Sequence, residues 1–157
     1  MNTLFKKSNP SWRAFAAISI FVVAACATAD MNPGIKIKLS GNQEVPAVST
    51  AANGIGAITV AADKSISGSV TTSGVDGKAA HIHEGAAGKN GPVIIPLTKT
   101  AEGAWVVPPG AKLSDAQYAS YMAGMLYVNV HSAANPGGEI RAQLTPPAPR
   151  AERVGGY

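Results

Sequence analysis

Short runs of alternating polar and apolar residues, each ended by Gly, Pro, Asn or Asp, most constrain what this chain can fold into. A period of two puts successive side chains on opposite faces of a strand, and the terminating residues are those that favour turns. Eight segments have this character: residues 35–39, 56–61, 65–72, 79–83, 92–97, 104–107, 126–131 and 139–144. Many short strands at this spacing predict an all-β fold, either a Greek-key β-sandwich or a barrel.

One short helix is predicted near residues 114–123. Ser114 and Gln117 have the spacing of a capping box, in which each side chain bonds the other residue's backbone. Leu113 and Tyr118 flank that start as a hydrophobic staple. Gly124 then ends the helix, because glycine favours the conformation that follows a last turn.

Residues 1–26 have the features of an export signal. A basic start, with Lys6, Lys7 and Arg13, precedes the apolar run 14–25. That run is shorter than the roughly 20 apolar residues that a membrane helix needs. It ends in Val23-Ala24-Ala25-Cys26, which resembles the lipobox of bacterial lipoproteins and implies acylation of Cys26.

The expected location is therefore the cell envelope, as a lipoprotein anchored to a membrane through Cys26 and facing the periplasm or the outer surface. Ordinary cleavage near residues 27–29 is the alternative, and it would give a secreted or soluble periplasmic protein. The domain organisation then becomes a tether at 27–34, a β domain at 35–145 and a disordered tail at 146–157. Cys26 is the only cysteine, so no intrachain disulfide is possible.

The charge of the chain gives little guidance about its partners. The formal net charge is +4, but three of the 13 basic residues and none of the nine acids precede Cys26. The remaining ten basic and nine acidic residues leave a net charge of +1. Without a basic stripe interleaved with aromatic residues, we expect no nucleic-acid binding.

All three histidines lie in two strand-like tracts. His81 and His83 share one strand face, about 6.5 Å apart along the strand, and Tyr127, Asn129 and His131 share a face of another. Neutral imidazole is the commonest metal ligand in proteins, so the third histidine can complete a three-nitrogen site. Copper is the first choice of ion, and zinc with a bound water is the alternative. The competing interpretation is that these are polar residues at strand ends, hydrogen-bonded across a hairpin.

Three further residues are candidates for supporting roles. Glu84 follows His83 but points to the opposite strand face, so it is either a loop carboxylate or a group that orients a ligand. Asn129 lies one pleat from His131 and can orient that region or a loop backbone. Arg141 either guides an anion towards the site or forms a surface ion pair with Glu139.

From about residue 39 to 144 the chain resembles the CHRD domain, first described in chordin. The resemblance rests on four motifs in the right order: Leu39-Ser40-Gly41-Asn42-Gln43-Glu44-Val45-Pro46, Ala80-His81-Ile82-His83, Tyr127-Val128-Asn129-Val130-His131 and Pro136-Gly137-Gly138-Glu139-Ile140-Arg141. It implies an all-β domain. Chordin's role as an extracellular scaffold also implies a structural or protein-interaction function.

A fainter similarity connects His81-Ile82-His83-Glu84-Gly85 with the copper-binding tract of copper/zinc superoxide dismutases. It implies that His81, His83 and His131 are copper ligands and that Arg141 guides the anionic substrate. No histidine is left for a bridging ligand or a zinc site, so a binuclear centre is excluded on ligand count. A single three-histidine site is what remains.

Three functions follow from these observations. The first is an exported envelope protein that binds a metal ion, with copper as the first choice and zinc as the alternative, for sequestration or for transfer to another envelope protein. The second is a structural or interaction module without metal. The third is a copper-only dismutase-like enzyme, which ranks last because the low net charge offers little electrostatic guidance.

Overall fold

The computed structural model describes Met1 and residues 34–147. The predicted export signal, the lipidation site at Cys26, nearly all of the tether and the tail from residue 148 lie outside the described residues. Among the described residues, no helix has the length and apolar character needed to cross a membrane.

Strands dominate the fold, which confirms the all-β prediction. The helical elements are η1 (Gly41–Gln43) and α1 (Asp115–Met122). The strands, in chain order, are β1 (Ile35–Ser40), β2 (Asn53–Val60), β3 (Ile66–Ser73), β4 (Gly77–Glu84), β5 (Val93–Pro96), β6 (Thr98–Ala101), β7 (Ala104–Val106), β8 (Leu126–Ser132) and β9 (Ile140–Leu144). Only β6 was not expected, because its four residues are all exposed and carry no apolar alternation.

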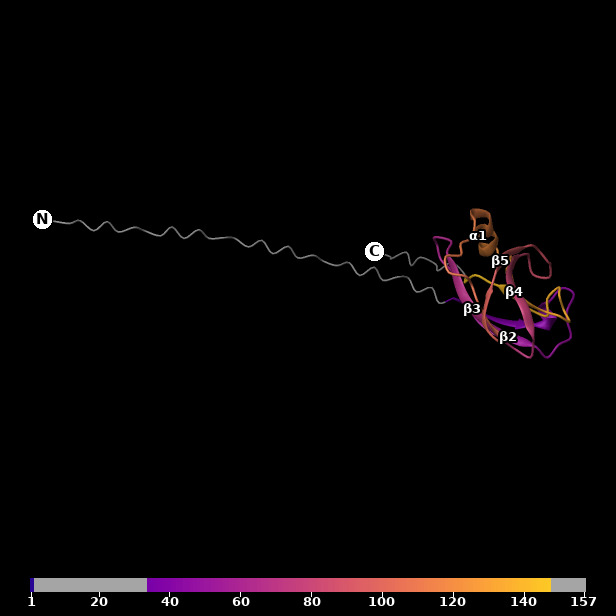
Figure 1. Cartoon of the computed structure of the whole chain (residues 1–157). Helices are drawn as coiled ribbons and strands as arrows, with labels where there is room; N and C mark the ends of the chain where they lie inside the picture. Colours follow the sequence, from indigo (N-terminus) through magenta and orange to yellow (C-terminus); the bar gives the residue numbers. More distant parts are fainter. Residues whose placement is uncertain (2–33, 148–157) are drawn as a thin grey trace, which may run out of the picture. The chain divides into compact units, whose positions relative to one another are not determined.

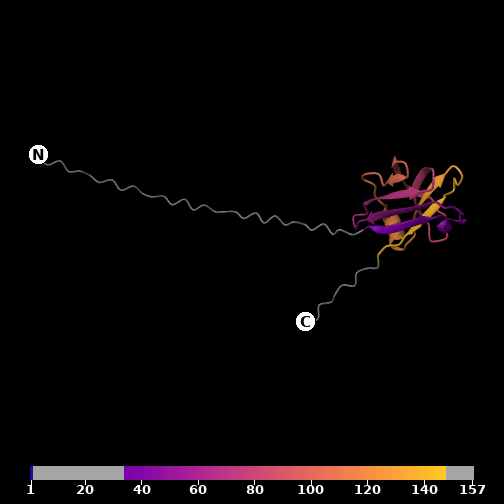
Figure 2. The same cartoon turned by 90° about the horizontal axis from the view of Figure 1, so that it is seen from below.

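The strands form one antiparallel sheet in the order β5-β4-β8-β9-β1-β2-β3-β7-β6. A single residue pair, Ser40 with Arg141, joins β1 to β9, so the sheet turns a corner there. The two halves, β5-β4-β8-β9 and β1-β2-β3-β7-β6, pack across one core as a sandwich (Figures 1 and 2). The order is not sequential, since β4 leaves its neighbour in sequence, β3, and pairs with β8.

The core takes one side of each strand. On β8, Leu126, Val128 and Val130 are completely buried against it. From the other half of the sheet, Ile58 and Trp105 enter the same core. Burying each such aliphatic side chain stabilises the fold by about 1.5–3 kcal/mol, so the alternating apolar positions specify which strand face turns inward.

The predicted helix start is confirmed in detail. Ser114 Oγ accepts a hydrogen bond from the Gln117 backbone at 3.2 Å, and Gln117 Oε1 accepts one from the Ser114 backbone at 2.9 Å. The helix α1 ends at Met122, and Gly124 follows with a φ of +71°. It lies at the end of β4, where Ser120 is hydrogen-bonded to Glu84, and is labelled at the top of the domain in Figure 1.

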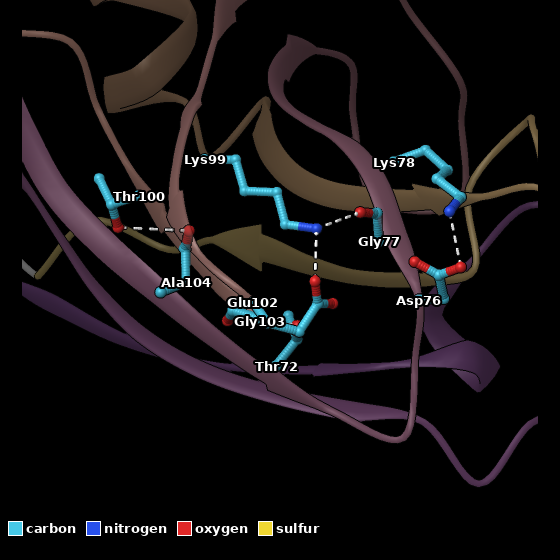
Figure 3. A network of polar contacts seen from close by, with 9 residues as sticks. All are labelled: Thr72, Asp76, Gly77, Lys78, Lys99, Thr100, Glu102, Gly103 and Ala104. Atoms are coloured by element: carbon cyan, nitrogen blue, oxygen red, sulfur yellow. Dashed lines mark hydrogen bonds and ion pairs between the residues drawn. The ribbon is translucent and has the colours of Figure 1, made fainter.

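The two edges of the sheet meet near Leu97. This residue separates the edge strands β5 and β6, and its backbone donates to the Ala80 carbonyl at 2.9 Å. Next to it, Lys99 donates to the Gly77 carbonyl at 3.0 Å and pairs with Glu102 at 2.9 Å (Figure 3). Lys99 therefore ties β6 to the first residue of β4, and the sheet is nearly closed into a barrel.

Candidate metal centre

The outer face of β4, β8 and β9 carries a second layer of packed side chains, opposite the apolar core. The register places His81 beside Asn129, and Asn129 beside Arg141. One pair further along, His83 lies beside Tyr127. The exposed fractions are only 7% for His83, 2% for Tyr127 and Asn129, and 1% for Arg141. This face is therefore a buried polar layer and not a solvated strand surface.

The segment 85–91 and the segment 41–45 cover this layer. Asn90 donates to the Val45 carbonyl at 2.6 Å, which joins the two segments. Backbone carbonyls of the first segment accept hydrogen bonds from the layer below, as Gly91 does from His83 at 2.9 Å and Gly85 from Gln143 at 2.9 Å. The glycine-rich loop after the histidine pair is thus a cover held by specific bonds.

All three histidines converge in this layer. One ligand nitrogen from each of His81, His83 and His131 lies within 4.8 Å of the other two. The closest pair is His81 Nδ1 and His131 Nε2, at 3.0 Å. Imidazole nitrogens bind a metal at about 2.0–2.1 Å, so two ligands of one ion lie at most about 4.2 Å apart. An adjustment of about 0.6 Å or less would bring the widest pair into this range.

Backbone carbonyls orient two of the three rings. His83 Nδ1 donates to the Gly91 carbonyl and His131 Nδ1 donates to the Pro136 carbonyl, each at 2.9 Å. A neutral imidazole that donates through Nδ1 keeps the lone pair of Nε2 free for a metal. His83 Nε2 is buried and has no hydrogen-bond partner among the described residues. The chemistry of this donor set therefore fits a metal ion.

Electrostatics keep His81 and His83 in the neutral form that binds metals. Burial, followed by repulsion from His131 and His83, lowers the pKa of His81. Burial also lowers the pKa of His83, although the hydrogen bond to Gly91 opposes this. Both rings are therefore neutral at pH 7, and a neutral ring binds a metal without first releasing a proton.

Arg141 and His83 pack against Tyr127 from its two sides, since β9 and β4 flank β8. The ring of His83 is parallel to that of Tyr127 within 8°, with 4.8 Å between centroids. The guanidinium carbon of Arg141 lies 3.4 Å from the Tyr127 centroid. Tyr127 also accepts a hydrogen bond from the Gly91 backbone at 3.2 Å, so the stack and the covering loop hold each other.

Arg141 does not form the surface ion pair that was one of its two expected roles. Its guanidinium donates to the Asn90 side chain and the Ala86 carbonyl at 3.3 Å, and to Gln143 at 3.1 Å. Glu139 instead accepts a hydrogen bond from Thr50 at 2.8 Å. The expectation of an ion pair was wrong because the segment 85–91 covers Arg141. Alternation along β9 predicts the face on which a side chain lies, but not which segment covers that face.

Glu84 lies on the opposite strand face from His83, as alternation predicts. Its Oε1 accepts a hydrogen bond from Ser120 of α1 at 2.5 Å. The carboxylate therefore anchors the helix to the end of β4, away from the three imidazoles.

Glu44 is the site residue that sequence reasoning missed. It follows η1, is only 6% exposed and lies close to Asn129 and Arg141. Burial raises its pKa to about 7, although the charge of Arg141 opposes the shift. The motif Gln43-Glu44-Val45-Pro46 marked this position, but nothing in its local pattern indicated a buried carboxyl beside a histidine cluster.

Gly138 makes this close packing possible. Its φ of +131° is one that residues with a side chain rarely adopt. A Cβ at this position would lie 2.5 Å from Glu44 Oε1 and 2.7 Å from Asn129 Nδ2. The glycine of the closing motif therefore lets two buried polar side chains lie against the backbone.

The family model of the CHRD domain matches residues 35–144. The chain belongs to the CHRD family. All the residues of the buried polar layer fall within the matched range, so the layer is a feature of this CHRD domain and not of an appended segment. No curated protein and no solved structure matches the chain significantly. The similarity to superoxide dismutases therefore rests on the short motifs alone.

Proposed function

We propose that this CHRD domain binds a single transition-metal ion through His81, His83 and His131. The observation that carries the proposal is the convergence of the three nitrogens, with Nδ1 of His83 and His131 bonded to backbone carbonyls so that each Nε2 carries the lone pair. Copper is the preferred ion, because imidazole suits it and affinity peaks at copper among first-row divalent metals. Zinc, completed by a water, is the alternative.

The surroundings favour sequestration or transfer of the ion. His81 and His131 are only partly buried, whereas His83 is 7% exposed, so the cluster opens to solvent on one side. Three protein ligands leave a further coordination position through which a ligand from another protein can take over the metal. A metal-accepting envelope protein is the partner that this arrangement suits.

The cellular setting is part of the proposal and rests on the sequence. A basic, apolar N-terminus ending in Val23-Ala24-Ala25-Cys26 supports export and lipid anchoring at Cys26. The domain would then bind its metal in the cell envelope. Secretion or a soluble periplasmic form is the alternative.

An interaction module without metal is the second candidate, and one observation favours it. His81 and His131 are hydrogen-bonded to each other at 3.0 Å, and His131 also bonds Pro136, so the rings can join β4, β8 and a turn by themselves. A dismutase-like enzyme ranks last. Its anion guide would be Arg141, whose side chain is already bonded to three acceptors and is 1% exposed.

The direct test is titration of the full chain with copper(II) and zinc(II), in competition with a chelator of known affinity. We expect one ion per chain and a loss of affinity of at least about 100-fold in each of His81→Ala, His83→Ala and His131→Ala. Copper(II) bound by three imidazoles should also show nitrogen hyperfine structure in its electron paramagnetic resonance spectrum.

Glu84→Gln is the matched control, since it changes a polar residue next to His83 on the opposite face. Its affinity should equal that of the unaltered protein. Equal affinity in all three histidine variants, together with a melting temperature that chelators leave unchanged, would overturn the metal proposal in favour of the interaction module.

A further inference from the structure

Within the described part of the chain, three buried polar atoms without hydrogen-bond partners lie in one group beside the histidine cluster. They are Glu44 Oε1, Asn129 Oδ1 and His83 Nε2. A buried polar atom left without a partner costs about 1–3 kcal/mol, so three in one place call for a physical reason. Asn129 lies between the other two residues, because it influences the pKa of both Glu44 and His83.

The position of the Asn129 amide at Gly138 gives its orientation, because an added Cβ there would lie 2.7 Å from Asn129 Nδ2 and 2.5 Å from Glu44 Oε1. Burial is the main influence on both pKa values, and it raises that of Glu44 and lowers that of His83. Asn129 lowers the pKa of Glu44 and raises that of His83, so it favours the charged form of each group. Nδ2 therefore lies on the Glu44 side of the amide, and the buried, unpartnered Oδ1 lies on the side of His83.

In this orientation two acceptors face each other. His83 donates through Nδ1 to Gly91, so its Nε2 carries a lone pair, and Asn129 Oδ1 can only accept. A cation bound to Nε2 makes the arrangement favourable. The same three groups can also be satisfied without a metal if the amide turns over and Glu44 carries a proton.

We propose that the Asn129 amide couples metal binding at His83 to the proton on Glu44, an inference that rests on the proposed metal site. With the metal bound, His83 Nε2 is a ligand and Asn129 Nδ2 donates to the ionised Glu44. Without it, the amide is turned by about 180°, Nδ2 donates to His83 Nε2, and the Glu44 hydroxyl donates to Oδ1. Metal binding thus sends one proton from Glu44 to solvent.

The charges around Glu44 suit this exchange. Arg141 on β9 is the charged group that acts on it, and its attraction favours the carboxylate while burial favours the neutral acid. The balance places the pKa at about 7, so either form is accessible near neutral pH. His83 is faced by His131 and Arg141, both of which disfavour a positive charge on its ring. Asn129 is accordingly a positioning residue, which acts on the metal through His83.

The experiment counts protons released on zinc(II) binding, by calorimetry in buffers of different ionisation enthalpy. At pH 6 the unaltered protein should release up to about one proton more than Glu44→Gln, because Glu44 holds a proton in the metal-free state and is ionised in the metal-bound state. At pH 8.5 the difference should vanish. Glu84→Gln, the control carboxylate off this path, should release as many protons as the unaltered protein at both pH values.

Two further measurements keep the inference testable if a variant is poorly folded. In the unaltered protein, zinc addition at pH 6 should remove an infrared band of a protonated carboxyl, and this band should be missing from Glu44→Gln. Asn129→Leu should bind zinc about 10–100-fold more weakly, as is typical when a group that orients a ligand is lost, and should release no proton from Glu44.

The outcomes separate the two proposals. No zinc binding by the unaltered protein would remove the metal site itself. Zinc binding with equal proton release by the unaltered protein and Glu44→Gln at pH 6, and no change in the carboxyl band, would leave the metal site and overturn the coupling.

Discussion

At the scale of single residues, this CHRD domain concentrates its unusual chemistry in one buried group. Arg141 is 1% exposed and Glu44 6% exposed, although charged residues are seldom so deeply buried. Hydrogen bonds from Arg141 to Asn90, Ala86 and Gln143 compensate part of the cost of burial. Burial raises the pKa of Glu44, so its protonation should influence stability as well as metal binding.

In the metal-free protein, Glu44→Gln should become increasingly stabilising as the pH rises. The folded pKa of about 7 lies above the ordinary 4.5, so the folded state holds the proton more tightly than the unfolded state. The stability that the fold gains from holding this proton is complete below pH 4.5 and is lost as the pH rises through 7. Glutamine carries no titrating proton, so the variant does not undergo this loss. Thermal melting from pH 4.5 to 8 should show a growing difference from the unaltered protein.

Glu139→Gln provides a control of opposite sign. Hydrogen bonds, of which the one from Ser132 has the largest effect, lower the pKa of Glu139. Its carboxylate therefore stabilises the fold once it is ionised. This variant should become less stable than the unaltered protein as the pH rises. The same trend in both variants would contradict the assignment of Glu44.

At the scale of elements, β8 shows how one strand can serve two layers. Leu126, Val128 and Val130 face the apolar core, whereas Tyr127 and Asn129 face the histidine cluster. All five side chains are almost fully buried. The covering loop buries the second face. The turn from β8 to β9 then determines how closely Glu44 can approach.

Gly138→Ala should destabilise the domain and weaken metal binding. Its φ of +131° and the close approach of Glu44 and Asn129 both exclude a methyl group. We expect a loss of about 1–3 kcal/mol in the free energy of unfolding, measured with urea. Gly137→Ala, where an added Cβ would meet nothing within 4 Å, should change stability by no more than about 0.5 kcal/mol. Equal effects at the two positions would show that Gly138 has no special role.

At the scale of the whole molecule, the sheet is closed by few interactions. One residue pair joins β1 to β9 at the corner, and Leu97 and Lys99 hold the opposite edges together. The histidine cluster lies on β4 and β8, so it belongs to the well-paired half of the sheet. Opening the edge at β6 should therefore leave the metal site intact.

Lys99→Met should loosen β6 and β7 without changing metal affinity. Methionine keeps an apolar side chain near Trp105 but removes the ammonium group that bonds Gly77 and Glu102. Hydrogen exchange should quicken in these two strands, with a loss of global stability below about 1 kcal/mol. Lys78→Met, which breaks the exposed pair with Asp76, should leave exchange in β6 unchanged. Faster exchange throughout β4 and β8 would contradict this account.

Local patterns in the sequence predicted much of this protein. Alternation located the strands and assigned His81 with His83, and Asn129 with His131, to shared faces. The capping box located α1, and the four motifs indicated the CHRD family. These predictions succeeded because side-chain direction in a strand and hydrogen bonding at a helix start depend only on residues close in the chain.

The tertiary structure alone decided what surrounds those residues. Pairing of β4 with β8 brought the histidines together, and the covering segments turned Arg141 from an expected surface residue into a buried one. The same packing brought Glu44, 85 residues before Asn129 in the chain, against it. A strand's own sequence specifies its two faces but not which distant segments cover them, because that choice depends on the packing of the whole sheet.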